Sequence, residues 1–330
     1  QAVKNSSADP IIGMYDVLAY KKDASGKKNI GYVFDMNSSF DADVQTFSLS
    51  PLNKQLLKIQ SFQKDKSFIR EIKSFPLNTE IRTVKTFSTE PQKISISPAP
   101  RIGRDLPAGL DAGVVTVELN TSMLLLPEIP MRKRFFDKRV GYFSNGYDVF
   151  EEESLKSDKE VFAVRWRLEP KNVEDAEKQK RGELIEPKKP IVYYIDPATP
   201  EKWKPFIKAG IDDWQAAFEF AGWKNAIRGE YWPENDPSMS LEDARFSVLR
   251  YFAADIQNAY GPNVHDPRTG EIMESHIGWY HNIMSLLRDW YLIQTAAVDP
   301  KARNKKFDDQ LMGELIRFVS SHEVGHTLGL

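Results

Sequence analysis

The sequence predicts an α+β protein, with a β-rich N-terminal domain at residues 1–182 followed by an α/β domain at residues 183–330. The first domain is rich in short runs of Val, Ile, Phe, Tyr and Thr, and several runs alternate apolar and polar residues as half-buried strands do. In the second, strand-like runs alternate with longer segments whose apolar residues recur every three or four positions, the period of an amphipathic helix. Such alternation is typical of an α/β arrangement.

Strand-like runs separated by turn-forming residues account for the β-rich half. Two of them lie on either side of a Pro-Leu-Asn turn at residues 76–78, which predicts a hairpin. Segments that contain glycine and proline separate the others and predict loops. The predicted strands cover residues 29–36, 45–50, 68–75, 79–87 and 113–126.

Residues 171–190 are charged, contain proline and lack aromatic residues, which indicates a linker or domain boundary. The continuous apolar run 189–196 that follows has the length of a central strand. An amphipathic helix should come next, capped at its start by Thr199 and ended by Gly222. Further predicted elements are strands over residues 225–232, 244–253 and 271–280 and helices over residues 282–298 and 307–330.

Composition and charge argue against several classes of protein. A formal net charge of −2 gives no global attraction to nucleic acid or to an anionic membrane. No stretch approaches the roughly 18 consecutive apolar residues that a transmembrane helix needs. The absence of cysteine excludes disulfides, cysteine-ligated zinc and cysteine nucleophiles. Because the chain begins with Gln1 rather than Met, we expect a processed chain or a fragment, cut at both ends.

The last predicted helix carries a His-Glu-x-x-His motif formed by His322, Glu323 and His326. The two histidines continue an apolar stripe of residues spaced by three and four, so they should share the buried face of the helix. Two imidazoles one helical turn apart can bind one Zn²⁺. The carboxylate of Glu323 can then act as the general base on a water molecule that the metal activates. The alternative is a pair of core histidines beside an exposed glutamate.

Gly329 stands three residues after the second histidine, where a glycine would end the helix and let the chain reverse. The pattern His-Glu-x-x-His-x-x-Gly-x-x-His is the metzincin form, in which this turn brings a third histidine to the metal. That histidine would fall at position 332, so we expect the third protein ligand of Zn²⁺ beyond Leu330. The other histidines, His265, His276 and His281, are interpreted as loop or strand residues.

Longer stretches of the chain carry a family resemblance, namely residues 123–143, 165–170, 182–227, 266–284 and 307–330. On these stretches the chain resembles large bacterial zinc-dependent proteases of the met-zincin type, in which an uncharacterised β-rich domain precedes a metzincin-like catalytic domain. The resemblance implies a twisted mixed sheet with two long helices and a C-terminal zinc helix. It also implies zinc ligands at His322 and His326, a catalytic base at Glu323, and export to the periplasm, the cell surface or the medium.

In metzincin-like domains the strand before the zinc helix usually lies at the sheet edge, and the resemblance gives this place to residues 271–280. An edge strand can accept an extended peptide through its unpaired backbone groups. We therefore expect a substrate to lie antiparallel to Ile272, Met273, Glu274, Ser275 and His276. The alternative is an ordinary edge strand protected by its charged residues.

These observations predict a zinc-dependent endopeptidase that acts on peptide or protein substrates through a metal-activated water, with Glu323 as general base. A first alternative is a non-catalytic scaffold that keeps the protease fold and binds a peptide or partner. A second is a zinc hydrolase acting on something other than peptides. The intact Glu323 favours an enzyme over a scaffold.

Overall fold

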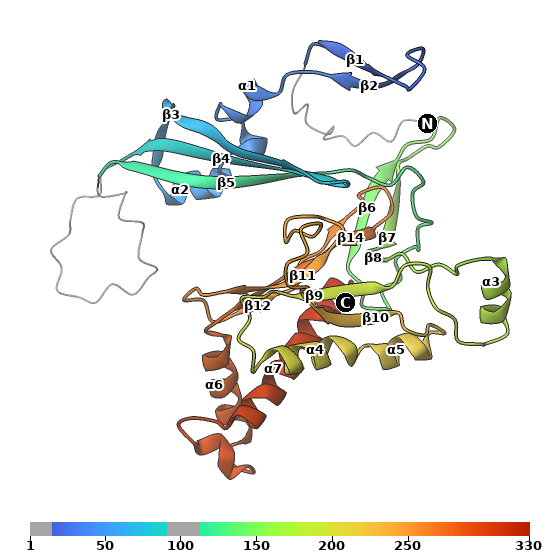
Figure 1. Ribbon diagram of the computed structural model, residues 1–330, viewed down its shortest axis with the longest axis vertical. Coiled ribbons are helices and arrows are strands. Elements are labelled where there is room, and N and C mark those ends of the chain that lie inside the picture. The colour runs from blue at the N-terminus through green and yellow to red at the C-terminus, as the bar shows by residue number, and fades with distance from the viewer. Residues whose placement is uncertain (1–14, 91–111) are drawn as a thin grey trace. The chain divides into compact units, whose positions relative to one another are not determined.

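The computed structural model describes residues 15–90 and 112–330, and its contacts divide the chain into two compact units (Figure 1). The first unit ends at Leu125 and the second begins at Leu126. Residues 126–182, which the sequence assigns to the N-terminal domain, therefore pack with the C-terminal part of the chain. The predicted domain boundary at residue 182 differs from this division and stays a prediction.

The first unit is built on an antiparallel sheet with the strand order β3-β4-β5. Its strands are β3 (Ile59–Ser74), β4 (Asn78–Thr89) and β5 (Val114–Leu124). The turn between β3 and β4 is closed by a hydrogen bond of 2.7 Å from the Phe75 N–H to the Asn78 carbonyl. The hairpin predicted around the Pro-Leu-Asn turn is thus confirmed. The smaller elements are β1 (Ala19–Lys22), β2 (Asn29–Val33) and α1 (Asn37–Phe40).

The strand predicted at residues 45–50 is wrong. This segment forms a 3₁₀ turn (Gln45–Phe47) and leads into helix α2 (Pro51–Leu56). The Ser50 side chain accepts a hydrogen bond from the Asn53 N–H, and a proline begins the helix, so local capping prevails over the β-forming residues.

Lys85 is buried in the middle of β4 with no exposed surface. Its Nζ donates a hydrogen bond of 2.6 Å to the Ala42 carbonyl and lies 5.9 Å from the centre of the Phe62 ring. Burial lowers the pKa of Lys85, and the nearby carboxylate of Asp43 offsets this only in part. The ammonium group is therefore less stable here than in the unfolded chain.

We expect Lys85 to make the free energy of unfolding rise with pH in the alkaline range. Between its lowered pKa and the ordinary value of 10.5, the unfolded chain binds more protons than the folded chain, so raising the pH favours folding. Urea unfolding from about pH 7 to about pH 10 measures this slope. Lys85→Met should remove this part of the slope, whereas Lys64→Met, at a largely exposed lysine of β3, should keep it. Identical slopes for the wild type and Lys85→Met would contradict the assignment.

The second unit contains a five-stranded mixed sheet with the order β10-β9-β11-β15-β12. All neighbouring pairs are parallel except the last, in which β12 runs antiparallel to β15. The predicted central strand is confirmed, because β9 has a neighbour on each side. The strands are β9 (Ile191–Ile195), β10 (Ile227–Tyr231), β11 (Ser247–Phe252), β12 (Ala259–Tyr260) and β15 (His276–Tyr280).

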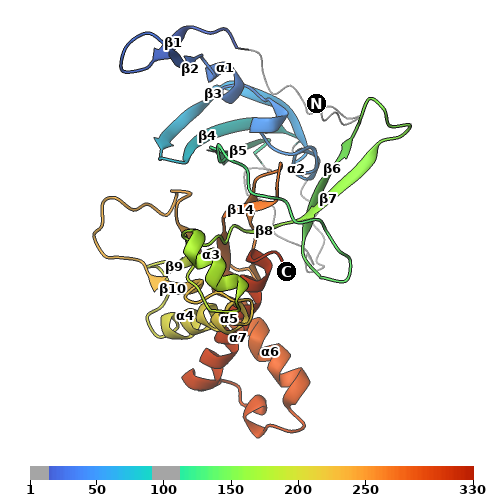
Figure 2. The same ribbon diagram turned by 90° about the vertical axis from the view of Figure 1, so that its right-hand side faces the viewer.

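Helices α4, α5 and α7 lie on one side of this sheet (Figure 1), and α6 lies next to α7 (Figures 1 and 2). Their bounds are α4 (Lys204–Asp212), α5 (Gln215–Phe220), α6 (Ile283–Thr295) and α7 (Asp309–Thr327). The core between sheet and helices is mainly aliphatic and also contains the buried rings of Tyr193, Trp203 and Trp279. Its most buried members include Ile207, Ile211, Leu249, Ile277 and Ile316.

The helix predicted after Thr199 is divided into α4 and α5 and begins later than expected. Thr199 does not cap it, because its N–H bonds the Asp196 carbonyl in a turn and its buried Oγ1 has no partner among the described residues. Gly222 adopts a φ of +89° after α5, where only glycine is unstrained, and so ends the helix as predicted.

A second small sheet and a hairpin complete this unit. The sheet has the order β13-β14-β8, and β6 pairs antiparallel with β7. The segment predicted as a linker contains a short capped helix, α3, and a 3₁₀ turn (Pro300–Arg303) precedes α7. The bounds are β6 (Ser144–Val149), β7 (Asp158–Ala163), β8 (Arg165–Trp166), β13 (Val264–His265), β14 (Glu271–Glu274) and α3 (Val173–Lys180).

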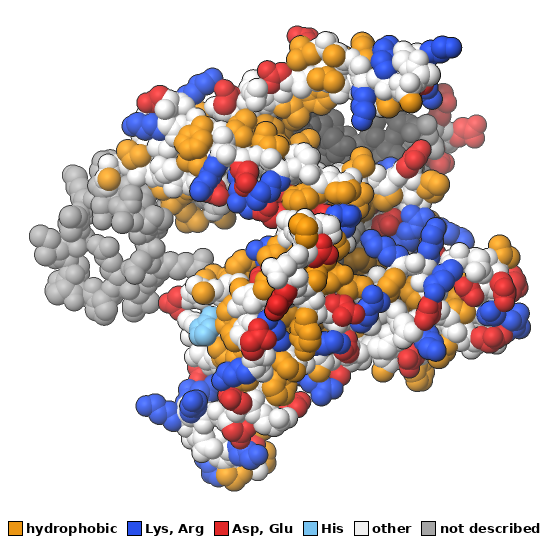
Figure 3. Space-filling model, viewed as in Figure 1, with side chains coloured by type: hydrophobic (Ala, Val, Ile, Leu, Met, Phe, Trp, Pro, Cys, Tyr) orange, Lys and Arg blue, Asp and Glu red, His pale blue; other side chains and the backbone are white. Residues whose placement is uncertain are grey.

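Basic and acidic side chains are interspersed over the second unit on the face drawn in Figure 3. This mixture of signs agrees with the formal net charge of −2 for the whole chain. Among the helices of the described residues, none combines the length and the apolar character that crossing a membrane requires.

Candidate metal centre

Helix α7 presents the His-Glu-x-x-His motif in its last two turns. It begins where the Asp308 side chain accepts a hydrogen bond of 2.7 Å from the Leu311 N–H and so caps the helix. Glycines bring it close to its neighbours. A Cβ on Gly210 of α4 would lie 2.5 Å from the Arg317 carbonyl oxygen, and a Cβ on Gly325 would lie 2.9 Å from the indole of Trp214.

Three aromatic side chains from distant parts of the chain bond to the motif-bearing end of α7. The indole N–H of Trp214 donates to the Ser321 carbonyl at 2.7 Å, and that of Trp166 donates to the Thr327 carbonyl at 2.9 Å. The hydroxyl of Tyr193, which is fully buried, donates to Thr327 Oγ1 at 2.7 Å. These bonds help to fix the position of the helix end, and the one to Thr327 satisfies a terminal carbonyl that has no partner within the helix.

The two histidine rings of the motif converge. The Nε2 atoms of His322 and His326 lie 3.1 Å apart, and the ring planes are inclined by 81°. The Nδ1 atom of His326 lies 2.9 Å from the Leu330 carbonyl oxygen. Since that oxygen only accepts, it favours the tautomer with the proton on Nδ1, which leaves Nε2 with a lone pair directed at Nε2 of His322.

Glu323 lies between the two histidines and is 7% exposed. Its Oε2 atom is buried and has no hydrogen-bond partner among the described residues. Burial raises the pKa of this carboxyl group, and the two neighbouring imidazoles act in the opposite direction. A buried polar oxygen without a partner is uncommon in a folded protein and is expected where a ligand or ion completes the site.

The histidines differ from the sequence prediction in their exposure. His322 is exposed and His326 is half-buried, whereas Glu323 is the motif residue on the buried face. The reason is that α7 packs on the sheet through residues such as Ile316 and Val324, which places the histidines on the flank of the helix. Both rings nevertheless face an open cavity rather than separate patches of solvent.

This cavity has a volume of about 630 Å³ and lies between α6, α7 and the segment 258–261. All three motif residues line it. Its remaining wall is mainly apolar, which suits an apolar side chain of a bound molecule. Among the apolar residues of the wall are Leu286, Leu287, Trp290, Leu315 and Phe318.

The imidazole nitrogens of His322 and His326 are of a ligand type that zinc prefers, and together they supply two ligands. Neutral imidazole nitrogens are common zinc ligands, and their separation of 3.1 Å lets one ion reach both at the usual distance of about 2.0–2.1 Å. Within residues 15–90 and 112–330, no group of three or more histidine and acidic side chains is arranged to hold a metal ion. The other three histidines bond elsewhere, for example His265 to Asn145 and His281 to Tyr251.

Gly329 adopts a φ of +101° just after α7, in the region that favours glycine. The chain turns back here, and the Leu330 N–H bonds the Gly325 carbonyl at 3.1 Å. A side chain at this position would collide with the Val164 carbonyl. The turn also places the Gly329 carbonyl where it accepts a hydrogen bond from the Phe143 N–H.

The expected edge strand at residues 271–280 is wrong. The segment is interrupted at Ser275 and forms β14 and β15, and each has a neighbour on both sides. Ile272 pairs with Trp166 on one side and His265 on the other, so its backbone is not free for a peptide. Of the five expected substrate residues Ile272, Met273, Glu274, Ser275 and His276, none lines the cavity of the motif. The two-residue strand β12 is at the edge instead.

Two family models match parts of the chain. A family model described as a domain of unknown function, DUF5117, matches residues 1–171, which is more than half of the chain. The chain belongs to the DUF5117 family. A second model, described as Met-zincin, matches residues 304–330, so the DUF5117 chain carries a metzincin-like region that includes α7 and its motif. No curated protein and no solved structure matches the chain.

Proposed function

We propose that the protein is a zinc-dependent endopeptidase in which His322 and His326 bind Zn²⁺ and Glu323 is the general base. One observation carries this proposal: two imidazole Nε2 atoms meet within 3.1 Å beside a buried carboxyl oxygen that has no partner. The Met-zincin match over the same helix supports it. A third protein ligand beyond Leu330 belongs to the proposal, as does export from the cell, which rests on the family resemblance alone.

The chemistry follows from the positions of the three side chains. Zinc, when bound, would polarise the carbonyl group of the substrate and lower the pKa of a water molecule. Glu323 would take the proton from the attacking water and give it to the leaving nitrogen. Its burial suits this role, because a raised pKa makes the carboxylate a stronger base at neutral pH.

The substrate would lie along β12 rather than along residues 272–276. Ala259 and Tyr260 line the cavity, and β12 pairs only with β15 among the described residues, so its other edge is available for strand addition. Gly261, directly after β12, packs against the backbone of Glu323. A peptide added to this edge would therefore pass close to the general base.

Zinc content tests the proposed ligands. Protein extended past residue 332 and purified without added metal should contain about one zinc ion per chain by mass spectrometry of the metal. His322→Ala and His326→Ala should each lose most of this zinc, because each removes one ligand. His281→Ala, at a histidine outside the motif, should retain it. Full zinc in His322→Ala or His326→Ala, or none in the extended wild type, would contradict the proposal.

A further inference from the structure

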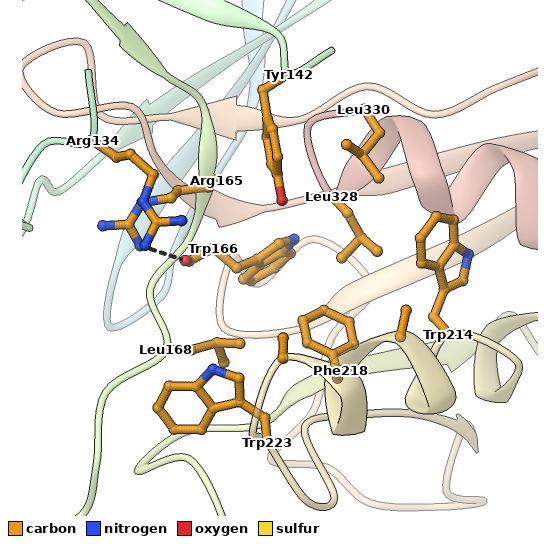
Figure 4. A pocket seen from close by; sticks show the side chains of 12 residues that line it. Arg134, Tyr142, Arg165, Trp166, Leu168, Trp214, Phe218, Trp223, Leu328 and Leu330 are labelled. Atoms are coloured by element: carbon orange, nitrogen blue, oxygen red, sulfur yellow. Dashed lines mark hydrogen bonds between the residues drawn. The ribbon is translucent and has the colours of Figure 1, made fainter. Parts of the chain in front are cut away.

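A second pocket in the C-terminal unit lies at the turn that follows α7 (Figure 4). Its volume is about 320 Å³, enough for a small organic molecule. It shares none of its lining residues with the cavity of the metal centre. Most of its wall is aromatic or aliphatic, and the residues concerned include Trp166, Leu168, Trp214, Phe218, Trp223 and Leu328.

Two arginines, Arg134 and Arg165, stand together at one side of this pocket (Figure 4). Among the described residues, neither forms an ion pair with an acidic side chain. Arg165 donates to two backbone carbonyls, those of Trp166 at 3.2 Å and Arg132 at 2.9 Å, and its Nε is buried without a partner. Burial lowers the pKa of Arg165, and the guanidinium of Arg134 lowers it further. The carboxylates of Glu271 and Glu169 act in the opposite direction, but both form ion pairs with Arg167 instead. A bound anion would therefore relieve the repulsion between the two guanidinium groups.

The remaining polar groups point to the same kind of ligand. The hydroxyl of Tyr142 points into the pocket beside Trp166 and can donate a hydrogen bond (Figure 4). No acidic side chain lines the wall, so a cation would find no ligand there. An inorganic anion would leave the large apolar part of the wall unused, whereas a purely apolar molecule would leave the two guanidinium groups unpaired.

We propose that this pocket binds an organic carboxylate with an aromatic or branched aliphatic body. The carboxylate would lie against Arg134 and Arg165, with Tyr142 as a further donor. The body would lie among the rings of Trp166, Phe218 and Trp223. Such a ligand is either a small free acid or the C-terminal residue of a peptide, and both present the same chemistry to the pocket.

Calorimetric titration with 4-phenylbutyrate tests this proposal, and 4-phenylbutyramide is the neutral comparison. The carboxylate should bind at least about tenfold more tightly than the amide, since charge-assisted hydrogen bonds to arginine are lost in the amide. A tetrapeptide ending in phenylalanine, with a free or an amidated C-terminus, distinguishes the two sources. Stronger binding of the free peptide than of 4-phenylbutyrate would identify a peptide C-terminus, and the reverse would identify a small acid.

Two variants locate the binding. Arg134→Gln, at an exposed arginine, should weaken the binding of 4-phenylbutyrate roughly tenfold and leave the binding of the amide unchanged. Ala217→Phe should fill the pocket and weaken both compounds. The matched control is Arg139→Gln, because Arg139 is exposed and pairs with Asp137 away from the pocket. Equal binding of acid and amide, no detectable binding of the acid, or equal losses in Arg134→Gln and Arg139→Gln would overturn the proposal.

Discussion

Replacement of Glu323 by glutamine is expected to lower kcat for peptide cleavage by about 10²–10⁴-fold while zinc stays bound. The amide has nearly the shape of the carboxylate, so His322 and His326 keep their positions, but it cannot accept a proton from water. Thermal stability should not fall, because the substitution neutralises a carboxyl group that is buried and has one oxygen without a partner.

Glu314→Gln is the matched control for this variant. Glu314 lies on the same helix, is exposed, and pairs with Arg317 rather than with the motif. Hydrolysis of fluorescently labelled casein by protein extended past residue 332, together with its zinc content, measures both effects. Cleavage by Glu323→Gln at the rate of Glu314→Gln would remove Glu323 from the mechanism, even if His322 and His326 bind zinc.

Trp279→Ala is expected to lower the free energy of unfolding of the second unit by about 3–5 kcal/mol. Trp279 is 2% exposed and lies on β15, between β11 and β12, in the core that α7 covers. Its removal loses the transfer free energy of the indole and leaves a cavity that the strands on either side cannot fill. A loss of this size is a large part of the roughly 5–15 kcal/mol that stabilises a typical domain.

Trp290→Ala provides the same substitution at an exposed site. Trp290 is 47% exposed on α6, so its removal should cost less than about 1 kcal/mol. Urea unfolding followed by circular dichroism measures both variants against the wild type. A similar loss in the two would show that burial of Trp279 does not stabilise the sheet as its position indicates.

Local sequence patterns were sufficient to predict the helix that carries the motif. The periodicity of the last helix and the spacing of His322, Glu323 and His326 depend on residues within one or two turns of each other. The same holds for the hairpin of β3 and β4. In such segments local preference and tertiary packing favour the same structure.

Features that depend on residues far apart in the sequence were not predicted. The edge strand is β12, which has only two residues and no apolar pattern of its own, and its place is decided by pairing with Trp279 and Gly278 of β15. The bonds from Trp166 and Trp214 to α7 join residues more than 100 positions apart. The exposure of His322 likewise follows from the face that α7 turns toward the sheet. The apolar stripe of residues spaced by three and four does not determine that orientation by itself.

The two indole groups that bond the Ser321 and Thr327 carbonyls enclose the motif between them. The backbone from one to the other is thereby tethered at both ends, which opposes fraying of the last turns of α7. Little conformational entropy is then left to lose when an ion arrives. The imidazoles are thus oriented before an ion binds, and we expect Trp166 and Trp214 to contribute to metal affinity through this preorganisation.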